Sequence, residues 1–172
     1  MRKYLAPLLL MAPILISGCA EEAEQEDMAP AVDLVSERAA VKTVVDRFPQ
    51  IMQEEDLELL AQTFANDSNL MVFGTDAAER WIGYDALLES IQIQFESYEE
   101  TDVTVRDQMI TVHPSGEVAW FSEVMDWTVT AGGEEVALEG LRFTGVLEKR
   151  QGSWMFVQGH ASVPVSGQAM QY

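Results

Sequence analysis

The sequence is poor in cysteine, histidine and basic residues, and each shortage argues against a class of function. The chain has 172 residues and one cysteine, so no disulfide can form within it. Cys19 and two distant histidines, His113 and His160, give no metal-ligand spacing, and we expect no metal or other cofactor. With 10 Lys and Arg against 29 Asp and Glu, the net charge is −19. Nucleic acid is therefore an unfavourable partner, because binding it requires clustered basic side chains.

Long apolar runs and familiar catalytic motifs are also scarce. The sequence contains no G-x-S-x-G, no P-loop and no dinucleotide fingerprint. An apolar run from Leu5 to Ile16 is interrupted by two prolines and is shorter than the roughly 20 residues that a membrane-spanning helix needs. Because Arg2 and Lys3 precede this run, the N-terminus has the layout of a secretory signal peptide.

The apolar run ends in Ile16-Ser17-Gly18-Cys19, which resembles the bacterial lipobox. The resemblance implies that residues 1–18 are removed and that Cys19 is lipidated, which would anchor the chain stably in a membrane. Ala20 follows the cysteine, whereas an Asp there usually signals retention in the inner membrane. We therefore expect a lipoprotein of the outer membrane that faces the periplasm. The alternative is an ordinary signal peptide that happens to contain a cysteine.

The chain after the lipobox divides into a short acidic segment and one domain. Residues 19–31 are acidic, lack aromatic side chains and predict a flexible tether. Residues 32–166 are predicted to form the domain, and residues 167–172 a C-terminal tail. With 48% apolar residues in the whole chain, there is enough apolar surface for one continuous core.

The domain is predicted to contain helices first and long strands afterwards. Apolar residues at three- and four-residue steps predict three helices, which begin near residues 34, 57 and 84, with Pro49 kinking the first. Two short strands are expected at residues 70–73 and 80–82. Alternating patterns and turn residues then predict four antiparallel strands, at residues 103–112, 118–130, 136–150 and 153–163. This order indicates an α+β domain with three helices packed on one face of a curved, mostly antiparallel sheet.

Several stretches resemble the SnoaL-like branch of the nuclear transport factor 2-like superfamily. They are the run LRFTGVL at residues 141–147, Gly152-Ser153-Trp154, QGHAS at residues 158–162, Trp81-Ile82-Gly83 and Ala119-Trp120-Phe121. The resemblance extends over roughly residues 32–165. It implies a cone-shaped domain with a pocket between helices and sheet, and a homodimer through the outer face of the sheet. Because members include isomerases, dehydratases, cyclases and assembly domains, the fold does not decide the chemistry.

Turn geometry suggests which polar side chains share a face of the sheet. A two-residue turn at Gly132-Gly133 places Trp127 opposite Leu138 and Glu123 opposite Arg142. Directly opposed residues point to the same face, so Glu123 and Arg142 are predicted to form an ion pair.

The last hairpin allows two registers. If Gln151-Gly152 is a two-residue turn, His160 lies opposite Phe143. If Gly152 instead occupies a bulge after a type I turn, the register moves by one residue and His160 lies opposite Arg142. We prefer the second register, because it places Trp154 and Phe156 on the helix-covered face together with a row of polar groups. The predicted site then contains Glu123, Arg142, His160, Trp127, Thr144 and Gln158, with Trp81 near the mouth of the pocket.

Three functions are consistent with this predicted site. The first is a lipid-anchored binding module for a small hydrophobic, acidic ligand, with Arg142 as the anion-binding group. The second is a cofactor-independent isomerase, dehydratase or cyclase in which His160 or Glu123 moves protons and Arg142 stabilises an anion. The third is a non-catalytic domain that forms dimers. In the plainest interpretation, Glu123 and Arg142 form a structural ion pair and His160 is a core residue.

Overall fold

The computed structural model describes residues 31–167 and residue 170. Cys19, the signal peptide and nearly all of the predicted tether lie outside these residues, so the predictions made for them stay predictions. The domain is a compact unit that begins at Val32. Among the helices that the structure describes, none is long and apolar enough to cross a membrane.

The first predicted helix is two helices, α1 (Leu34–Val45) and α2 (Arg47–Glu54). The Asp33 carboxylate caps α1 by accepting hydrogen bonds from the backbone N–H groups of Val35 (3.1 Å) and Ser36 (3.2 Å). The helix breaks at Asp46 because Pro49, three residues further on, has no N–H to donate to the carbonyl of Val45 and its ring crowds that carbonyl.

The other two predicted helices are α3 (Leu57–Thr63) and α4 (Tyr84–Ser97). As the sequence predicts, Asp56 caps α3, with its carboxylate 2.8 Å from the backbone nitrogen of Leu59. Gly83 precedes α4 with a φ of +86°, a conformation that glycine adopts without strain. The three helical segments expected from the sequence are therefore present.

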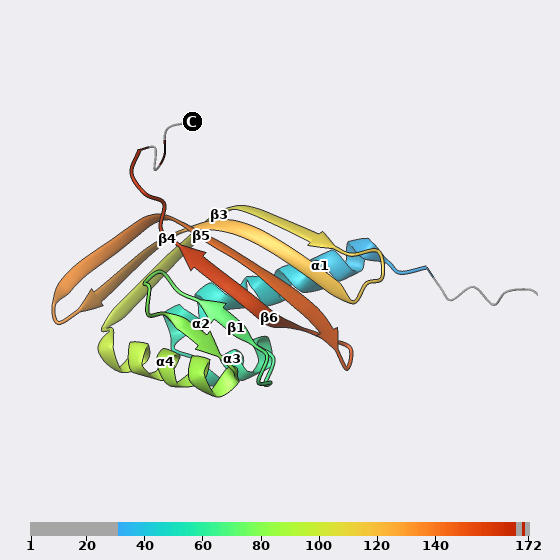
Figure 1. Cartoon of the computed structure of the whole chain (residues 1–172), viewed down its shortest axis with the longest axis horizontal. Helices are drawn as coiled ribbons and strands as arrows, with labels where there is room; N and C mark the ends of the chain where they lie inside the picture. Colours follow the sequence, from blue (N-terminus) through green and yellow to red (C-terminus); the bar gives the residue numbers. More distant parts are fainter. Residues whose placement is uncertain (1–30, 168–169, 171–172) are drawn as a thin grey trace, which may run out of the picture. The chain divides into compact units, whose positions relative to one another are not determined.

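Six strands form one curved sheet that the helices cover on one face (Figure 1). The order across the sheet is β2-β1-β6-β5-β4-β3, and every pair is antiparallel except β1 with β6. The strand bounds are β1 Met71–Phe73, β2 Arg80–Ile82, β3 Glu100–Val112, β4 Val118–Ala131, β5 Glu134–Arg150 and β6 Ser153–Ser162. The predicted α+β fold is confirmed.

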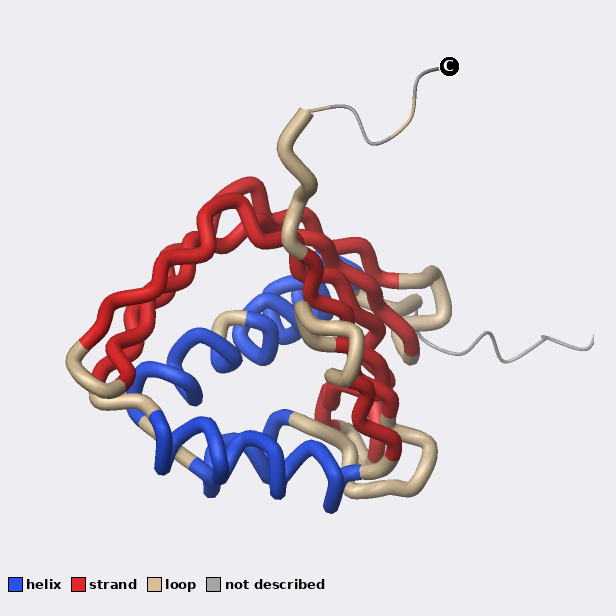
Figure 2. Tube along the Cα trace, turned by 60° about the vertical axis from the view of Figure 1, so that its left-hand side comes forward, coloured by secondary structure: helices blue, strands red, loops and turns tan. Residues whose placement is uncertain are grey.

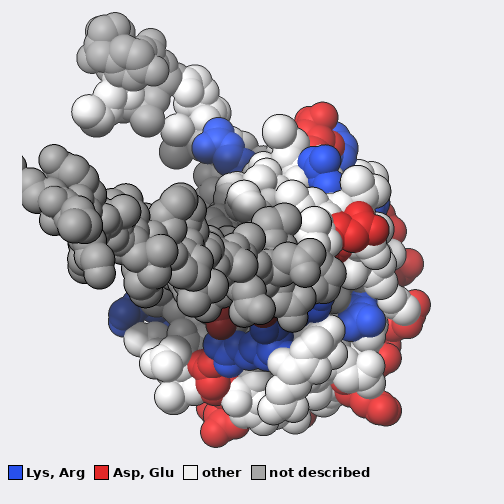
Figure 3. Space-filling view, turned by 90° about the vertical axis from the view of Figure 1, so that its right-hand side faces the viewer, with Lys and Arg blue, Asp and Glu red and all other residues white. Residues whose placement is uncertain are grey.

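Charged side chains attach α1 and the loop after α3 to the β5–β6 hairpin. The Glu37 carboxylate of α1 accepts hydrogen bonds from Lys149 and, at 2.8 Å, from the indole N–H of Trp154. Asp67 forms an ion pair with Arg150. On this side of the molecule, acidic and basic side chains lie interspersed (Figure 3).

An aromatic cluster fills the core where the helices meet the sheet. Phe156 is fully buried. Its ring stacks on Phe64 at 4.9 Å between centroids and meets Phe121 edge-on at 5.4 Å. Further along, Phe48 of α2 stacks on Phe143 at 4.7 Å. Beyond these rings the long β4–β5 hairpin bends toward α4 (Figure 2), and this part of the interior is not filled.

Candidate functional site

A cavity of about 140 Å³ lies between the helices and the bent β4–β5 hairpin. Most of its walls are apolar side chains: Met52, Leu60, Leu87 and Ile91 from the helices, Val72 from β1, and Val129, Val136, Leu138 and Leu141 from the hairpin. Its lining is that of a small-molecule site, which is typically a largely apolar pocket with a few polar groups that orient the ligand.

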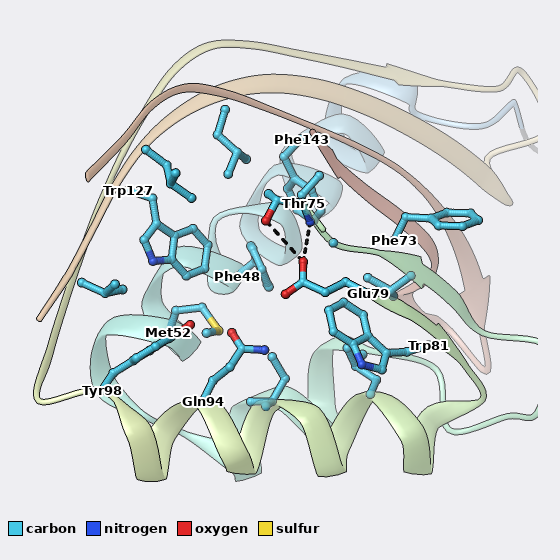
Figure 4. A pocket seen from close by; sticks show the side chains of 18 of the residues that line it. Phe48, Met52, Phe73, Thr75, Glu79, Trp81, Gln94, Tyr98, Trp127 and Phe143 are labelled. Carbon is cyan, nitrogen blue, oxygen red and sulfur yellow. Dashed lines mark hydrogen bonds between the residues drawn. The ribbon is translucent and has the colours of Figure 1, made fainter. Parts of the chain in front are cut away.

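Aromatic rings supply much of the remaining wall (Figure 4). Trp127 of the hairpin and Trp81 of β2 lie on opposite sides of the cavity, and Tyr98 lies at the end of α4. Phe48 is 5.9 Å from Trp127 between ring centroids. The ring of Phe73 is turned away from the cavity and contacts His160 on the other face of the sheet, 5.6 Å between centroids.

Glu79 is the carboxylate that lines this cavity (Figure 4). Its Oε2 accepts hydrogen bonds from the backbone N–H groups of Thr75 (2.6 Å) and Asp76 (2.9 Å), and one from the Thr75 hydroxyl (3.3 Å). The loop from Gly74 to Glu79 is also closed by a backbone hydrogen bond of 2.9 Å between these two residues. The loop thus fixes the position of the carboxylate while leaving Oε1 without a hydrogen bond to any described residue.

Gly74 allows this arrangement because it has no side chain. A Cβ atom at position 74 would lie 2.8 Å from the Cβ of Glu79 and 2.8 Å from the ring of Trp81, and closer still to the Glu79 carboxylate. These separations are shorter than carbon–carbon van der Waals contact. Glycine at this position is therefore needed for Glu79 and Trp81 to pack side by side.

Two further polar side chains line the cavity, both from the end of α4. The Gln94 amide donates a 3.2 Å hydrogen bond to the hydroxyl of Ser90 within the same helix. Burial raises the pKa of the Tyr98 phenol, and the negative charges of Glu79 and Asp76 raise it further. Tyr98 therefore stays protonated at neutral pH and keeps a hydroxyl that can donate a hydrogen bond.

The register of the β4–β5 hairpin agrees with the sequence prediction only near the turn. Trp127 lies opposite Leu138 as predicted, but Glu123 lies opposite Phe143 and not opposite Arg142. The difference arises at a bulge, where two residues of β5 oppose Asp126 alone. Gly140 forms this bulge with a φ of +71°, and its N–H donates a 2.7 Å hydrogen bond to the Asp126 carboxylate. The predicted Glu123–Arg142 ion pair is therefore wrong.

Neither predicted register of the last hairpin describes the observed position of His160. The turn is the two-residue type, with Gln151 and Gly152 both at positive φ, and it pairs Arg150 with Ser153. An additional residue in β6 between Phe156 and Gln158 then shifts the register. As a result, His160 lies opposite Thr144, which is neither Phe143 nor Arg142.

The structure does not bring the predicted site residues together. Trp81 and Trp127 line the cavity. Four of the predicted site residues point instead to the opposite, outer face of the sheet: Arg142, Thr144, Gln158 and His160. Arg142, Thr144 and His160 are exposed, and the cavity lining includes none of the four. The predicted row of a base, an arginine and a histidine in one pocket therefore does not form.

Glu123 faces the helices but lies apart from the cavity. It is 3% exposed, and its Oε2 accepts a 2.9 Å hydrogen bond from the amide of Gln108. The same amide donates to Asp46 at the α1–α2 junction, also at 2.9 Å. Oε1 has no partner among the described residues. Burial raises the pKa of Glu123 to about 7, and the nearby charge of Asp46 acts in the same direction.

Sequence reasoning missed Glu79, Tyr98 and Gln94. For Glu79 the sequence does contain a signal: it lies two residues before Trp81, and residues two apart in an extended segment point to the same face. The expectation that Trp81 lies near a pocket mouth could thus have placed Glu79 there too. Among residues 31–167 and 170, no group of three or more His, Cys, Asp or Glu side chains could hold a metal ion.

Comparisons with known proteins identify the fold and a family. The model of the family described as SnoaL-like domain matches residues 41–166. A nuclear transport factor 2-like superfamily protein from Salmonella enterica superposes with a TM-score of 0.71 at 16% identity, over 80% of this chain and 99% of that one. A type 2 hexachlorocyclohexane dehydrochlorinase superposes with a TM-score of 0.64 at 14% identity, over 80% and 95%.

A third solved structure, an uncharacterized protein with a cystatin-like fold from Caulobacter vibrioides, gives a TM-score of 0.64 at 15% identity, over 76% of this chain and 92% of that one. At such identities the likeness establishes the fold alone. No curated protein sequence matches the chain.

Proposed function

Since the chain belongs to the SnoaL-like domain family, we propose that its domain binds a small, largely apolar molecule in the cavity between the helices and the β4–β5 hairpin. The observation that carries this proposal is the unfilled interior, whose walls are apolar and aromatic except for a few polar groups. An acidic ligand was expected because Arg142 was placed in the pocket. Arg142 lies on the outer face, so the reason for that expectation is gone.

The proposal is tested by filling the cavity. Ala161 lines the cavity, whereas its neighbour Ser162 points to the outer face. We expect phenethyl alcohol to bind the full chain saturably in isothermal titration calorimetry, and Ala161→Phe to abolish this binding. The matched control Ser162→Phe should bind as the unchanged chain does. Equal binding by the two variants would place the ligand elsewhere and overturn the proposal.

We also propose, from the sequence, that the protein acts at a bacterial membrane to which Cys19 anchors it. The support is the charged start, the apolar run and the lipobox-like residues 16–19. Globomycin blocks removal of lipoprotein signal peptides, so it should make the uncleaved precursor accumulate. Processing that is indifferent to globomycin, or to Cys19→Ser, would contradict the anchor.

A specific observation supports assembly into a homodimer through the outer face of the sheet. Trp120 on β4 is 46% exposed, and Met109 on β3 is 69% exposed. Met109 lies opposite Ser122, which is two residues from Trp120 along β4, so the two side chains are near neighbours on one face of the sheet. Large exposed apolar side chains that gather on one face commonly mark an interaction surface. Analytical ultracentrifugation of the full chain should show a dimer that Trp120→Glu dissociates, and a monomer in both cases would overturn this proposal.

A further inference from the structure

The charge inside the cavity is of one sign. Glu79 and Tyr98 are the ionisable side chains that line it, and no Lys, Arg or His is among the described lining residues. The three groups that donate hydrogen bonds to Glu79 are two backbone N–H groups and a hydroxyl, and all are neutral. Within the described part of the chain no salt bridge involves Glu79. The cavity therefore contains a carboxylate whose charge no other side chain neutralises.

The negative charge also acts on Tyr98, at the C-terminal end of α4. Glu79 and Asp76 both raise the pKa of its phenol, although burial is the larger cause. Arg80 does not offset this charge, because it is exposed and points away from Trp81, its inward-facing neighbour in β2. The charge of Glu79 would repel an anionic ligand, and no positively charged side chain among the described lining residues would offset that repulsion.

The faces of the aromatic rings that line the cavity have a negative electrostatic potential as well. Trp81, Trp127, Tyr98 and Phe48 come from four different elements or their ends and surround the space into which Glu79 projects (Figure 4). The quadrupole of an aromatic ring attracts a cation to its face, most strongly for Trp, and cages of such rings bind ammonium groups. A carboxylate at the edge of such a cage adds a charge of the complementary sign.

We propose that the cavity selects a small organic ammonium cation with an apolar substituent. The ammonium group would lie between the Trp81 and Trp127 rings beside Glu79 Oε1, and the apolar part would fill the space toward Leu138 and Ile91. This inference rests on the proposed binding function and adds the chemical class of the ligand. Gly74 contributes by letting Glu79 and Trp81 come together at one wall.

Three ligands with one skeleton test the class: phenethylamine, phenethyl alcohol and phenylacetate, which are cationic, neutral and anionic at neutral pH. We would measure their affinities for the full chain by isothermal titration calorimetry. The amine should bind about tenfold more tightly than the alcohol, and the carboxylate should bind more weakly than both. Because the amine and the alcohol both donate hydrogen bonds, their difference isolates the charge.

Two variants then assign the effect to the site. Glu79→Gln keeps an oxygen for the N–H groups of Thr75 and Asp76 and removes the charge, so the amine should lose about tenfold in affinity and the alcohol almost nothing. The control Glu89→Gln, an exposed position of α4 outside the cavity, makes the same change in net charge and should alter neither affinity. Should Glu79→Gln fail to fold, Trp127→Leu replaces it, with the same selective loss for the amine.

The outcomes separate this inference from the proposed function. If the alcohol binds as tightly as the amine, or the carboxylate binds best, the cation selectivity is wrong and the apolar cavity still functions. An equal loss for amine and alcohol in Glu79→Gln also overturns the selectivity, because the residue would then act on the shape of the cavity. If none of the three binds, both proposals fail.

Discussion

Two glutamates point to the interior of the domain, and their surroundings are opposite. Glu79 is half-buried at the edge of a cavity, where three donors converge on one of its oxygens and leave the other free. Glu123 is enclosed between the α1–α2 junction and the sheet, with one hydrogen bond from Gln108 and an oxygen without a described partner. Backbone N–H groups hold the first carboxylate at the wall of the cavity, whereas burial disfavours the charged form of the second, which lies apart from the cavity.

The parts of the domain around the two glutamates also differ in how tightly they are packed. Around Phe156 the aromatic rings are close-packed and fully buried, so this region contributes stability. Around Glu79 the rings line an open space. The side chains there make fewer van der Waals contacts, and the space has room for a ligand. Experiments on single residues should therefore separate a part of the molecule that determines folding from the part to which we assign the proposed binding.

The largest difference should come from removing one ring from each part. Phe156→Ala removes a fully buried ring that contacts Phe64 and Phe121, and we expect it to cost about 3–5 kcal/mol of unfolding free energy. Trp127→Ala removes a half-buried ring from the wall of an existing cavity, so it should cost only about 1–2 kcal/mol. Urea unfolding of both variants gives these values. Equal costs would mean that the cavity region is packed as tightly as the rest of the core.

The next difference concerns pH. The folded-state pKa of Glu123, about 7, is above the ordinary value of 4.5, so the folded chain holds this proton more tightly than the unfolded chain does. The stability contribution is therefore fully present below about pH 4.5, decreases as the pH rises toward about 7 and stays low above it. The total loss is about 3 kcal/mol. The charged neighbours that face Glu123 are Asp46, which raises its pKa, and Lys42, which lowers it.

Glu123→Gln has no proton to lose and should remove this dependence. In the unchanged chain, the unfolding free energy should fall by most of about 3 kcal/mol between about pH 5 and about pH 8 because Glu123 ionises. In the variant this part of the decrease should be absent. Glu89→Gln, at an exposed position of α4, serves as the control and should leave the difference between the two pH values as it was. A variant that keeps the full pH dependence would show that Glu123 ionises normally.

The sequence predicted the fold well because the fold depends on strong local signals. Helix caps at Asp33 and Asp56 and the paired glycines of the β4–β5 turn act through hydrogen bonds or φ angles within a few residues. The residues that share a face of the sheet depend instead on an uninterrupted count along two strands. One bulge at Gly140 and another in β6 each shift that count, and every later side chain changes its partner.

The candidate site was predicted only in part for the same reason. Trp127 lies between the turn and the first bulge, so its position was predicted correctly, whereas Arg142 and His160 lie beyond the bulges and were placed wrongly. A bulge at Gly140 could be suspected from a glycine inside a strand pattern. Nothing in the sequence marks the bulge in β6, since Val157 is an ordinary strand residue.

A smaller effect should separate the two roles of Glu79 itself. Glu79→Ala removes the acceptor of the Thr75 and Asp76 N–H groups, and because water can replace it at the exposed loop, the cost should be about 1 kcal/mol. Glu79→Gln keeps an acceptor oxygen, so it should lower the unfolding free energy by only a few tenths of a kcal/mol. Urea unfolding measures both. If the glutamine variant is as unstable as the alanine variant, the charge holds the loop, and Glu79 is then a structural residue in addition to any role in binding.

A very small effect is also expected at Arg142, and it tests the strand register that keeps Arg142 away from Glu123. With Glu123 as its partner, Arg142 would neutralise a buried carboxylate, and Arg142→Ala would cost about 3–5 kcal/mol because the carboxylate would be left unpaired. On the outer face, exposed and opposite Val124 and Ser162, the same substitution should change the unfolding free energy by no more than about 0.5 kcal/mol. It should also leave the pH dependence that Glu123 causes intact, which Glu123→Gln does not. A large loss of stability together with a changed pH profile would show that Arg142 reaches Glu123 in solution, and the bulge at Gly140 would then have to be absent.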